Sequence, residues 1–273
     1  MSGLEQCLIN SLAPTKVGKI IAISGDRITV SGIDVCVGSV ATVDDSDLEC
    51  VGFKGGYSFF VSIGKQSRIQ AGDLVYVSDK AGGQTIPRDI SGEVLDCYGN
   101  SLISKTNSDD KIKLPDLQKK TNPLSRPSIS IPMDVGVRTI NTFTSIGVGQ
   151  RIGIMAGTGV GKSTLIGMIS KFTNADAVII NLVGERSREV NDFIRDNLTE
   201  ESRKRTTIVV STADETPMEK IKSADLAISI AEKLKNEGKN VLLMMDSMTR
   251  YANAYRDVMI SAGEIPANRG FPA

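Results

Sequence analysis

Two patterns of hydrophobic and polar positions divide the chain. Between Val17 and Val77, short runs alternate apolar and polar residues and are separated by turn dipeptides such as Gly25-Asp26 and Gly55-Gly56. Such alternation is typical of half-buried strands, and short strands joined by tight turns are typical of a small barrel. The expected strands are Ile20 to Ser24, Ile28 to Val30, Leu48 to Phe53, Tyr57 to Ile63 and Leu74 to Val77. We therefore predict a small closed β-barrel within residues 1–86.

After Gly149 the pattern changes to apolar runs that alternate with segments of helical period. This order predicts an α/β domain with a parallel sheet, because parallel strands are joined by crossover helices. The expected strands are Ile152 to Met155, Ala177 to Val183, Thr207 to Ser211 and Val241 to Met245. The expected helices are Lys162 to Phe172, Arg188 to Leu198, Pro217 to Glu237 and Met248 to Ala262. Residues 87–128 combine a strand-like run, Gly92 to Asp96, with a polar stretch that contains prolines, which predicts a connector.

A glycine-rich turn joins the first of these expected strands to the first helix. The sequence from Ala156 to Thr164 is AGTGVGKST, in which alanine stands where the strict phosphate-binding pattern has its first glycine. Glycines let the backbone turn its N–H groups inward, lysine reaches the β- and γ-phosphates, and a hydroxyl holds Mg²⁺. We therefore expect ATP and Mg²⁺ to bind through Gly157, Thr158, Gly159, Val160, Gly161, Lys162, Ser163 and Thr164, with Ser163 at the metal.

Carboxylates that follow two other strands are candidates for metal binding and catalysis. Asp246 follows the strand that begins at Val241, and at this end of a parallel sheet it can hold water of the Mg²⁺ shell or cap the next helix. Glu185 is the candidate base, with Arg186 near the γ-phosphate and Glu189 at the Mg²⁺ water shell. A charged helix start in solvent is the alternative for these three residues.

Composition narrows the chemistry and the partners. The 32 basic and 32 acidic residues cancel, and residues 1–86 carry seven basic against nine acidic residues, a net charge of −2. This balance disfavours nucleic acid as a partner. The chain has no histidine, so acid–base chemistry falls on carboxylates, lysine or tyrosine. Four separated cysteines without a CxxC pair, and no signal-peptide or membrane-spanning pattern, indicate a cytoplasmic protein.

These motifs resemble those of the rotary-type secretion ATPases, which are relatives of the catalytic subunit of ATP synthase. Within that family the chain most resembles the flagellar protein-export ATPases, and the injectisome ATPases of virulence secretion are the near alternative. Two positions depart from the family pattern, at Ser187 and Ile265. The motifs that carry the resemblance are Ala156 to Ser163, Val183 to Val190, Met245 to Ala252 and Ala262 to Pro272, with Asn122 to Pro127, Gly136 to Arg138 and Gly149 to Arg151 upstream.

The resemblance implies a RecA-like P-loop ATPase core in residues 129–273, preceded by the β-barrel for ring assembly. It implies Lys162 and Ser163 as phosphate and metal contacts, Glu185 as catalytic base, Arg186 near the γ-phosphate and Asp246 in the metal site. It also implies a homohexamer at the inner face of the membrane export gate, with a central stalk, stator-like regulatory proteins, export substrates and chaperones as partners. The family continues beyond the last residue of this chain, so we expect an incomplete core with hydrolysis near background.

Two other functions remain open from the residues. A non-hydrolysing nucleotide-binding subunit of a rotary ATPase tends to lack the carboxylate at the position of Glu185. An RNA-translocating hexamer of the termination-factor type needs a basic barrel with exposed aromatic residues. The negative barrel, in which Tyr57, Phe59 and Phe60 are expected core residues, argues against RNA.

Overall fold

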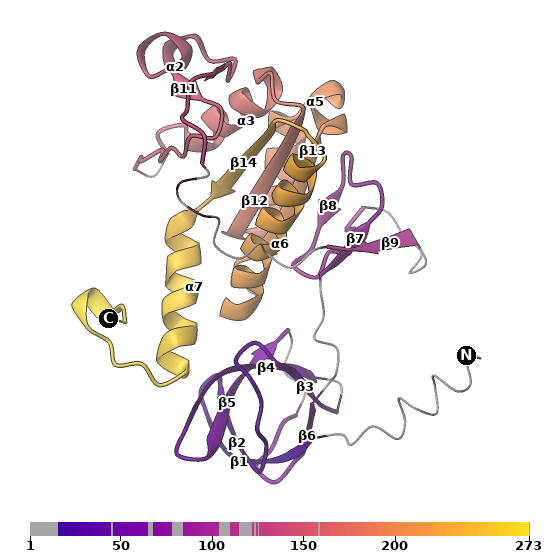
Figure 1. Cartoon of the computed structure of the whole chain (residues 1–273), viewed down its shortest axis with the longest axis vertical. Helices are drawn as coiled ribbons and strands as arrows, with labels where there is room; N and C mark the ends of the chain where they lie inside the picture. The colour runs from indigo at the N-terminus through magenta and orange to yellow at the C-terminus, as the bar shows by residue number, and fades with distance from the viewer. Residues whose placement is uncertain are drawn as a thin grey trace. The chain divides into compact units, whose positions relative to one another are not determined.

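The protein is described by a computed structural model, drawn in Figure 1. The described residues are 16–44, 46–64, 68–77, 84–103, 110–114, 122, 124, 126–157 and 159–272. By its contacts the chain divides into two compact units. The first consists of residues 1–82, 216–218 and 253–273, and the second of residues 83–215 and 219–252.

The first unit contains a closed six-stranded antiparallel barrel, which confirms the predicted barrel. Its strands are β1 (Val17–Ser24), β2 (Arg27–Ser31), β3 (Val40–Val43), β4 (Ser46–Lys54), β5 (Tyr57–Ile63) and β6 (Leu74–Val77), in the order β1-β2-β5-β4-β3-β6. Alternate residues fill the interior, among them Ile20, Leu48 and Phe60. The sequence analysis missed β3, whose four residues are too few for a clear alternation.

The expected burial of the barrel's aromatic residues is right for Phe60 and wrong for Tyr57. Phe60 is completely buried, whereas Tyr57 is 45% exposed and Phe59 is half-buried beneath the Arg27 guanidinium, 5.1 Å from its ring centre. Successive side chains of a strand point to opposite faces, so the core takes only one of the two neighbours at 59 and 60. The case against RNA therefore depends on the charge of the barrel more than on its aromatic residues.

The second unit is built on a four-stranded parallel sheet, as predicted. Its strands are β8 (Val94–Leu95), β12 (Ala177–Glu185), β13 (Thr206–Thr212) and β14 (Val241–Asp246), in the order β14-β12-β13-β8. The connecting helices are α3 (Lys162–Phe172), α4 (Ser187–Asn197), α5 (Glu200–Lys204) and α6 (Pro217–Asn236), and α7 (Met248–Ser261) follows β14. One sheet face packs on α6 through Ile179 and Leu226, and the other on α3 and α4 through Ile166 and Phe193.

The prediction of a strand from Ile152 to Met155 is wrong. These residues form no strand in the structure, and Met155 is 96% exposed. A four-residue strand persists only where a neighbour takes its hydrogen bonds, and within the described residues this segment pairs with none. The glycine-rich turn is therefore joined to α3 on one side but not to a strand on the other.

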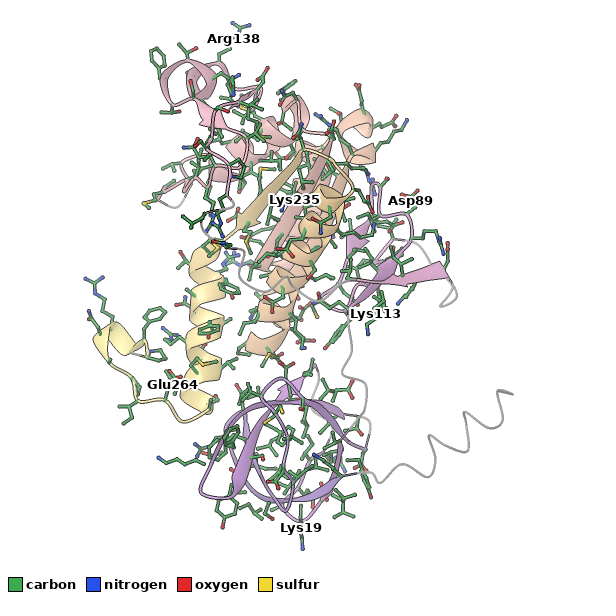
Figure 2. All side chains as sticks on the ribbon, in the orientation of Figure 1. Lys19, Asp89, Lys113, Arg138, Lys235 and Glu264 are labelled. Atoms are coloured by element: carbon green, nitrogen blue, oxygen red, sulfur yellow. The ribbon has the colours of Figure 1, made fainter. Side chains whose placement is uncertain are left out.

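Short elements complete the second unit. They are the pair β7 (Thr85–Pro87) and β9 (Lys111–Lys113), the pair β10 (Pro132–Met133) and β11 (Ile146–Gly147), and α2 (Arg138–Phe143). A 3₁₀ turn, η3 (Asn268–Gly270), lies near the C-terminus in the first unit. Charged side chains such as Lys113, Arg138 and Lys235 are exposed and project outward (Figure 2). Among the described residues, no helix combines the length and apolar composition needed to cross a membrane.

Candidate nucleotide-binding site

The glycine-rich turn leaves its backbone open at the start of α3. Gly159 and Gly161 have φ of +76° and +94°, which favour glycine, and no atom lies within 4 Å of a Cβ placed on either. Lys162 begins α3, and Ser163 and Thr164 are exposed in its first turn. Gly157 and Val160 are also exposed, whereas the predicted contact residue Thr158 lies outside the described residues. Bare N–H groups and a helix N-terminus are what an anionic phosphate needs.

The opposite end of α3 is fixed by one arginine. Arg205 Nη1 donates hydrogen bonds to the carbonyls of Thr173 and Ala175 at 2.7 and 3.1 Å. Its Nη2 donates to the carbonyls of Ser170 and Lys171 at 3.4 and 2.9 Å. A guanidinium at a helix C-terminus satisfies free carbonyls and complements the negative end of the helix dipole. Arg205 therefore ties the helix that carries the glycine-rich turn to the start of β13.

Lys162 and Asp246 meet across the site. The Lys162 Nζ lies 2.6 Å from Asp246 Oδ1, and the Asp246 side chain is only 6% exposed at the end of β14. The buried Asp246 Oδ1 faces the Lys162 ammonium, and a metal-bound water can take this place only when the ammonium turns away. The structure thus brings together the predicted phosphate-binding lysine and the predicted metal-site aspartate, which lie 84 positions apart in the sequence.

Glu185 ends β12 and forms an ion pair with Arg250 of α7. Its side chain is 15% exposed. The preceding residue, Gly184, has φ of +65° and lies at a register shift between β12 and β13. A Cβ on Gly184 would come within 3.1 Å of Arg250 Cδ, so glycine makes room for the arginine. Arg250 also lies 3.4 Å from the carbonyl of Val183, to which its Nη1 donates.

The pKa values of Glu185 and Glu189 are shifted in opposite directions. Burial raises the pKa of Glu185, although Arg250 opposes the shift, and the hydrogen bond with Glu189 and the charge of Asp246 raise it further. The same hydrogen bond with Glu185 is the main cause that lowers the pKa of the exposed Glu189. Arg186 is 82% exposed and contacts Glu189 at 3.4 Å between Nη1 and Oε1. A carboxylate whose pKa is raised by burial is a candidate proton acceptor.

The structure therefore gathers most of the predicted site and adds one residue. Lys162, Asp246 and Glu185 face other charged groups of the site. Arg186 is the exposed residue just before α4, and Glu189 lies on the exposed first turn of that helix. Arg250, whose role the sequence left open, belongs to the site through Glu185. Its position one turn into α7, four residues after Asp246, was the only signal in the sequence.

A glycine-rich turn that opens a helix beside a parallel sheet, with a lysine paired to an aspartate at the end of a neighbouring strand, defines a P-loop nucleotide-binding protein. The chain belongs to the ATP synthase alpha/beta family, because residues 136–273 match the nucleotide-binding domain of that family. The P-loop and the three carboxylates all lie within the matched range.

Two flagellum-specific ATP synthases are similar to most of this chain. The flagellum-specific ATP synthase of Pseudomonas aeruginosa is 37% identical over 280 residues, which cover 100% of this chain and 62% of that protein. The flagellum-specific ATP synthase of Bacillus subtilis is 40% identical over 82% of this chain and 51% of that protein. The chain thus spans less than two thirds of the length of these relatives.

A solved structure has the same fold. The assembled ATPase EscN of the type III secretion system of enteropathogenic Escherichia coli superposes with a TM-score of 0.83 and 35% identity, over 93% of this chain and 62% of EscN. EscN in complex with its central stalk EscO superposes with a TM-score of 0.81.

Proposed function

We propose that the chain binds ATP with Mg²⁺ at the P-loop, and that the complete protein hydrolyses it. The pairing of Lys162 with Asp246, beside a Glu185 held by Arg250, is the observation that carries this proposal. The residues fit the ligand: the uncrowded backbone at Gly159 and Gly161 leaves room for phosphate, and the buried Asp246 carboxylate suits a hydrated divalent cation. Thr158 and Val160 complete the loop, and Ser163 supplies the hydroxyl that the metal needs.

Each residue has a distinct task in hydrolysis. Lys162 exchanges its contact with Asp246 for the β- and γ-phosphates, which leaves Asp246 and Ser163 to hold the metal, with Glu189 at the water shell. Bound Mg²⁺ supplies positive charge that offsets the charge developing on the phosphates. Glu185 accepts a proton from the attacking water, since burial has raised its proton affinity. The exposed Arg186 is free to turn toward the γ-phosphate.

We propose that this hydrolysis energises type III protein export in the flagellar system. The flagellum-specific relatives support the flagellar form, while the similarity to EscN supports the injectisome as the alternative. We assign residues 1–86 to ring assembly, 87–128 to a connector that also supplies β8 to the parallel sheet, and 129–273 to the ATPase domain. A homohexamer and a central stalk partner are supported by the assembled EscN and its EscO complex.

Further partners belong to the same proposal and come from the family resemblance. They are stator-like regulatory proteins, export substrates and their chaperones, met in the cytoplasm at the inner face of the membrane export gate. Nucleic acid is not among them, because the barrel carries net negative charge.

Binding is tested by titration calorimetry of ATP, with and without Mg²⁺, into this chain and its Lys162→Ala variant. We expect the variant to lose measurable binding, because the ammonium supplies the main side-chain contact to phosphate. Lys171→Ala, at the other end of the same helix, is the control and should bind like the original chain. Equal affinity of the Lys162 variant and the control would overturn the proposed site.

Catalysis is tested separately in the complete protein. Glu185→Gln keeps the size of the side chain but removes the base, so nucleotide should still bind while turnover falls by about 10²–10⁴-fold. Glu201→Gln, on the exposed surface of α5, is the matched control. Wild-type turnover in Glu185→Gln would place the base elsewhere. No turnover in the unsubstituted protein would favour the non-hydrolysing subunit.

A further inference from the structure

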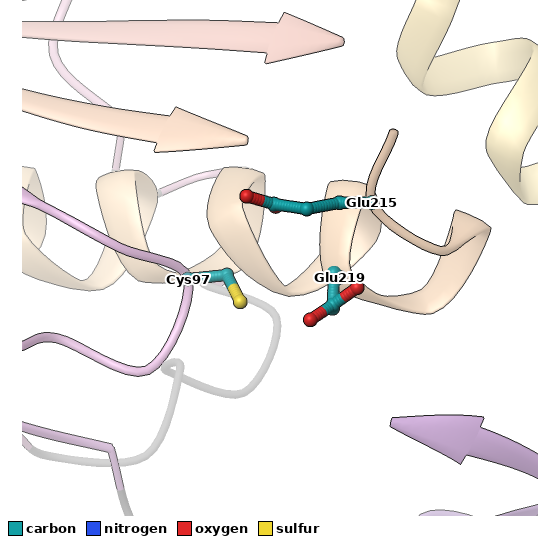
Figure 3. Close-up of side chains that lie close together, drawn as sticks. All are labelled: Cys97, Glu215 and Glu219. Carbon is teal, nitrogen blue, oxygen red and sulfur yellow. The ribbon is translucent and has the colours of Figure 1, made fainter. Parts of the chain in front are cut away.

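A second group of metal-ligating side chains lies at the other edge of the parallel sheet. The ligand atoms of Cys97, Glu215 and Glu219 all lie within 4.8 Å of one another (Figure 3). Cys97 follows β8, and the two glutamates follow the neighbouring strand β13, so the group forms where two parallel strands end. Asp246 follows β14 at the opposite edge, which separates this group from the P-loop lysine and its aspartate.

The segment that carries Cys97 is a closed turn. Asp96 Oδ1 accepts hydrogen bonds from the backbone N–H groups of Tyr98 and Asn100 at 2.9 and 2.8 Å. Gly99 has φ of +78°, and a Cβ there would lie 2.0 Å from the carbonyl oxygen of Thr85. The backbone around Cys97 is therefore fixed before any ligand binds, which lowers the cost of assembling a site.

Hydrogen bonds also fix the segment that carries the two glutamates. Lys220 Nζ donates to the carbonyls of Ala213 and Glu215, at 3.0 and 2.8 Å, and so fixes the turn before α6. Glu215 Oε1 accepts a hydrogen bond from the Thr212 hydroxyl at 3.2 Å, whereas Glu215 Oε2 is buried and has no hydrogen-bond partner among the described residues. A buried carboxylate oxygen without a partner is costly, and in native proteins it calls for a ligand, a water or an ion.

The remaining contact orients a carboxylate. The Tyr98 hydroxyl donates a hydrogen bond to Glu219 Oε1 at 3.0 Å. Glu219 is only 8% exposed. Groups that hold a ligating carboxylate in this way are a usual part of metal sites.

We propose that Cys97, Glu215 and Glu219 bind one divalent cation that favours sulfur, with Zn²⁺ as the best fit. Thiolate and carboxylate are both ligands of Zn²⁺, at about 2.3 Å for sulfur and about 2.0–2.2 Å for oxygen. A tetrahedral ion with such bonds draws the three ligand atoms closer together than they stand now, which rotation of the two glutamate side chains achieves. A water takes the fourth position. Magnesium is disfavoured because it prefers six oxygen ligands and avoids thiolate.

Electrostatics agree with this assignment. Burial, followed by the charges of Glu215 and Glu219, raises the pKa of the Cys97 thiol. Burial likewise raises the pKa of Glu215, and the charge of Glu219 adds to the shift. A cation between Cys97 and Glu215 would offset the charge that their burial disfavours, and the thiol proton passes to solvent when the metal binds.

The test uses Cd²⁺, which reports a thiolate bond by ultraviolet charge-transfer absorption. The full chain with Cys7, Cys36 and Cys50 changed to serine retains Cys97 as its single thiol. We expect this protein to bind one Cd²⁺ with the thiolate band, and Zn²⁺ to remove the band by competition. Adding Glu219→Gln should weaken Cd²⁺ binding by about tenfold or more, because it removes a charged ligand but keeps the thiol.

The matched control is Glu237→Gln at the end of α6, an exposed glutamate outside the group, which should bind Cd²⁺ unchanged. A second control has Cys36 as its single cysteine, with Cys97 changed to serine. It should show no thiolate absorption band that saturates at one Cd²⁺ per chain. Circular dichroism of every variant shows whether the fold is retained. Absence of the band in the folded Cys97-only protein would overturn the proposal. So would equal Cd²⁺ affinity in Glu219→Gln and Glu237→Gln, since the metal would then bind the thiol alone.

Discussion

Replacing Arg205 by alanine tests how the helix behind the P-loop is held. Arg205 donates to four backbone carbonyls at the C-terminal end of α3 and in the residues that follow, and two of these contacts are as short as 2.7 and 2.9 Å. Alanine removes all four donors at once and also the positive charge at the helix C-terminus. The carbonyls then depend on water that enters the space left by the side chain.

The magnitude follows from the contacts. A hydrogen bond from a charged donor contributes about 1.5–3 kcal/mol, but four bonds from one guanidinium are not additive. The two short bonds contribute most, and water can replace part of their effect at this half-buried site. We therefore expect Arg205→Ala to lower the free energy of unfolding by about 3–4 kcal/mol. At about 2–4 °C per kcal/mol for a unit of this size, the melting temperature should fall by about 6–16 °C. Arg205→Lys keeps the charge but loses the two-pronged geometry, so it should recover only part of the loss.

Thermal unfolding followed by far-ultraviolet circular dichroism measures the effect. The helical signal reports mainly on the second unit, which contains α3 to α5 and most of α6. Lys204→Ala, an exposed neighbour at the end of α5, is the control for loss of one positive charge and should shift the transition by less than about 2 °C. If Arg205→Ala melts within about 2 °C of Lys204→Ala, water satisfies the carbonyls and the guanidinium does not hold α3 in place.

Two further predictions concern the bulge beside Glu185 and the barrel core. Gly184→Ala should destabilise the second unit by about 1–3 kcal/mol and weaken the Arg250 contact. Gly238→Ala, where φ is also positive at +87° but the space around it is open, should show backbone strain alone. Equal melting temperatures of the two variants would contradict the close approach to Arg250. Phe60→Ala should destabilise the barrel by about 3–5 kcal/mol, as judged by urea unfolding, and the exposed Tyr57→Ala on the same strand by far less. Similar losses for both would show that the strand faces are assigned wrongly.

Most of the fold could be predicted from local pattern, and the exceptions have a physical cause. Regions with a clear hydrophobic period were predicted as the right elements. The bounds of α3 were predicted as observed, and those of β12, β13 and β14 to within two residues. The strand expected from Ile152 to Met155 depends on a partner that local sequence does not contain. The short α5 and β3 were missed because four or five residues contain too little of a period to recognise.

The candidate site was predictable where a motif fixes chemistry, and not where packing does. The spacing of glycines, lysine and serine predicts a phosphate-binding turn without reference to tertiary structure. Arg250 could not be assigned, because an arginine on a helix meets Glu185 only through the arrangement of β12 and α7. The Cys97 group was also missed, since Cys97 is 118 positions before Glu215 and only the pairing of β8 with β13 brings them together.

The charged groups of the P-loop site are paired with one another in the structure, and this has a physical reason. A buried carboxylate without a counter-charge costs several kcal/mol, so Asp246 and Glu185 can be buried only because Lys162 and Arg250 lie against them. Under the proposed function, phosphate would take the lysine and a divalent cation would take the aspartate. Nucleotide binding would then be an exchange of charged partners at nearly constant local charge, which avoids leaving a buried charge without a partner at any step.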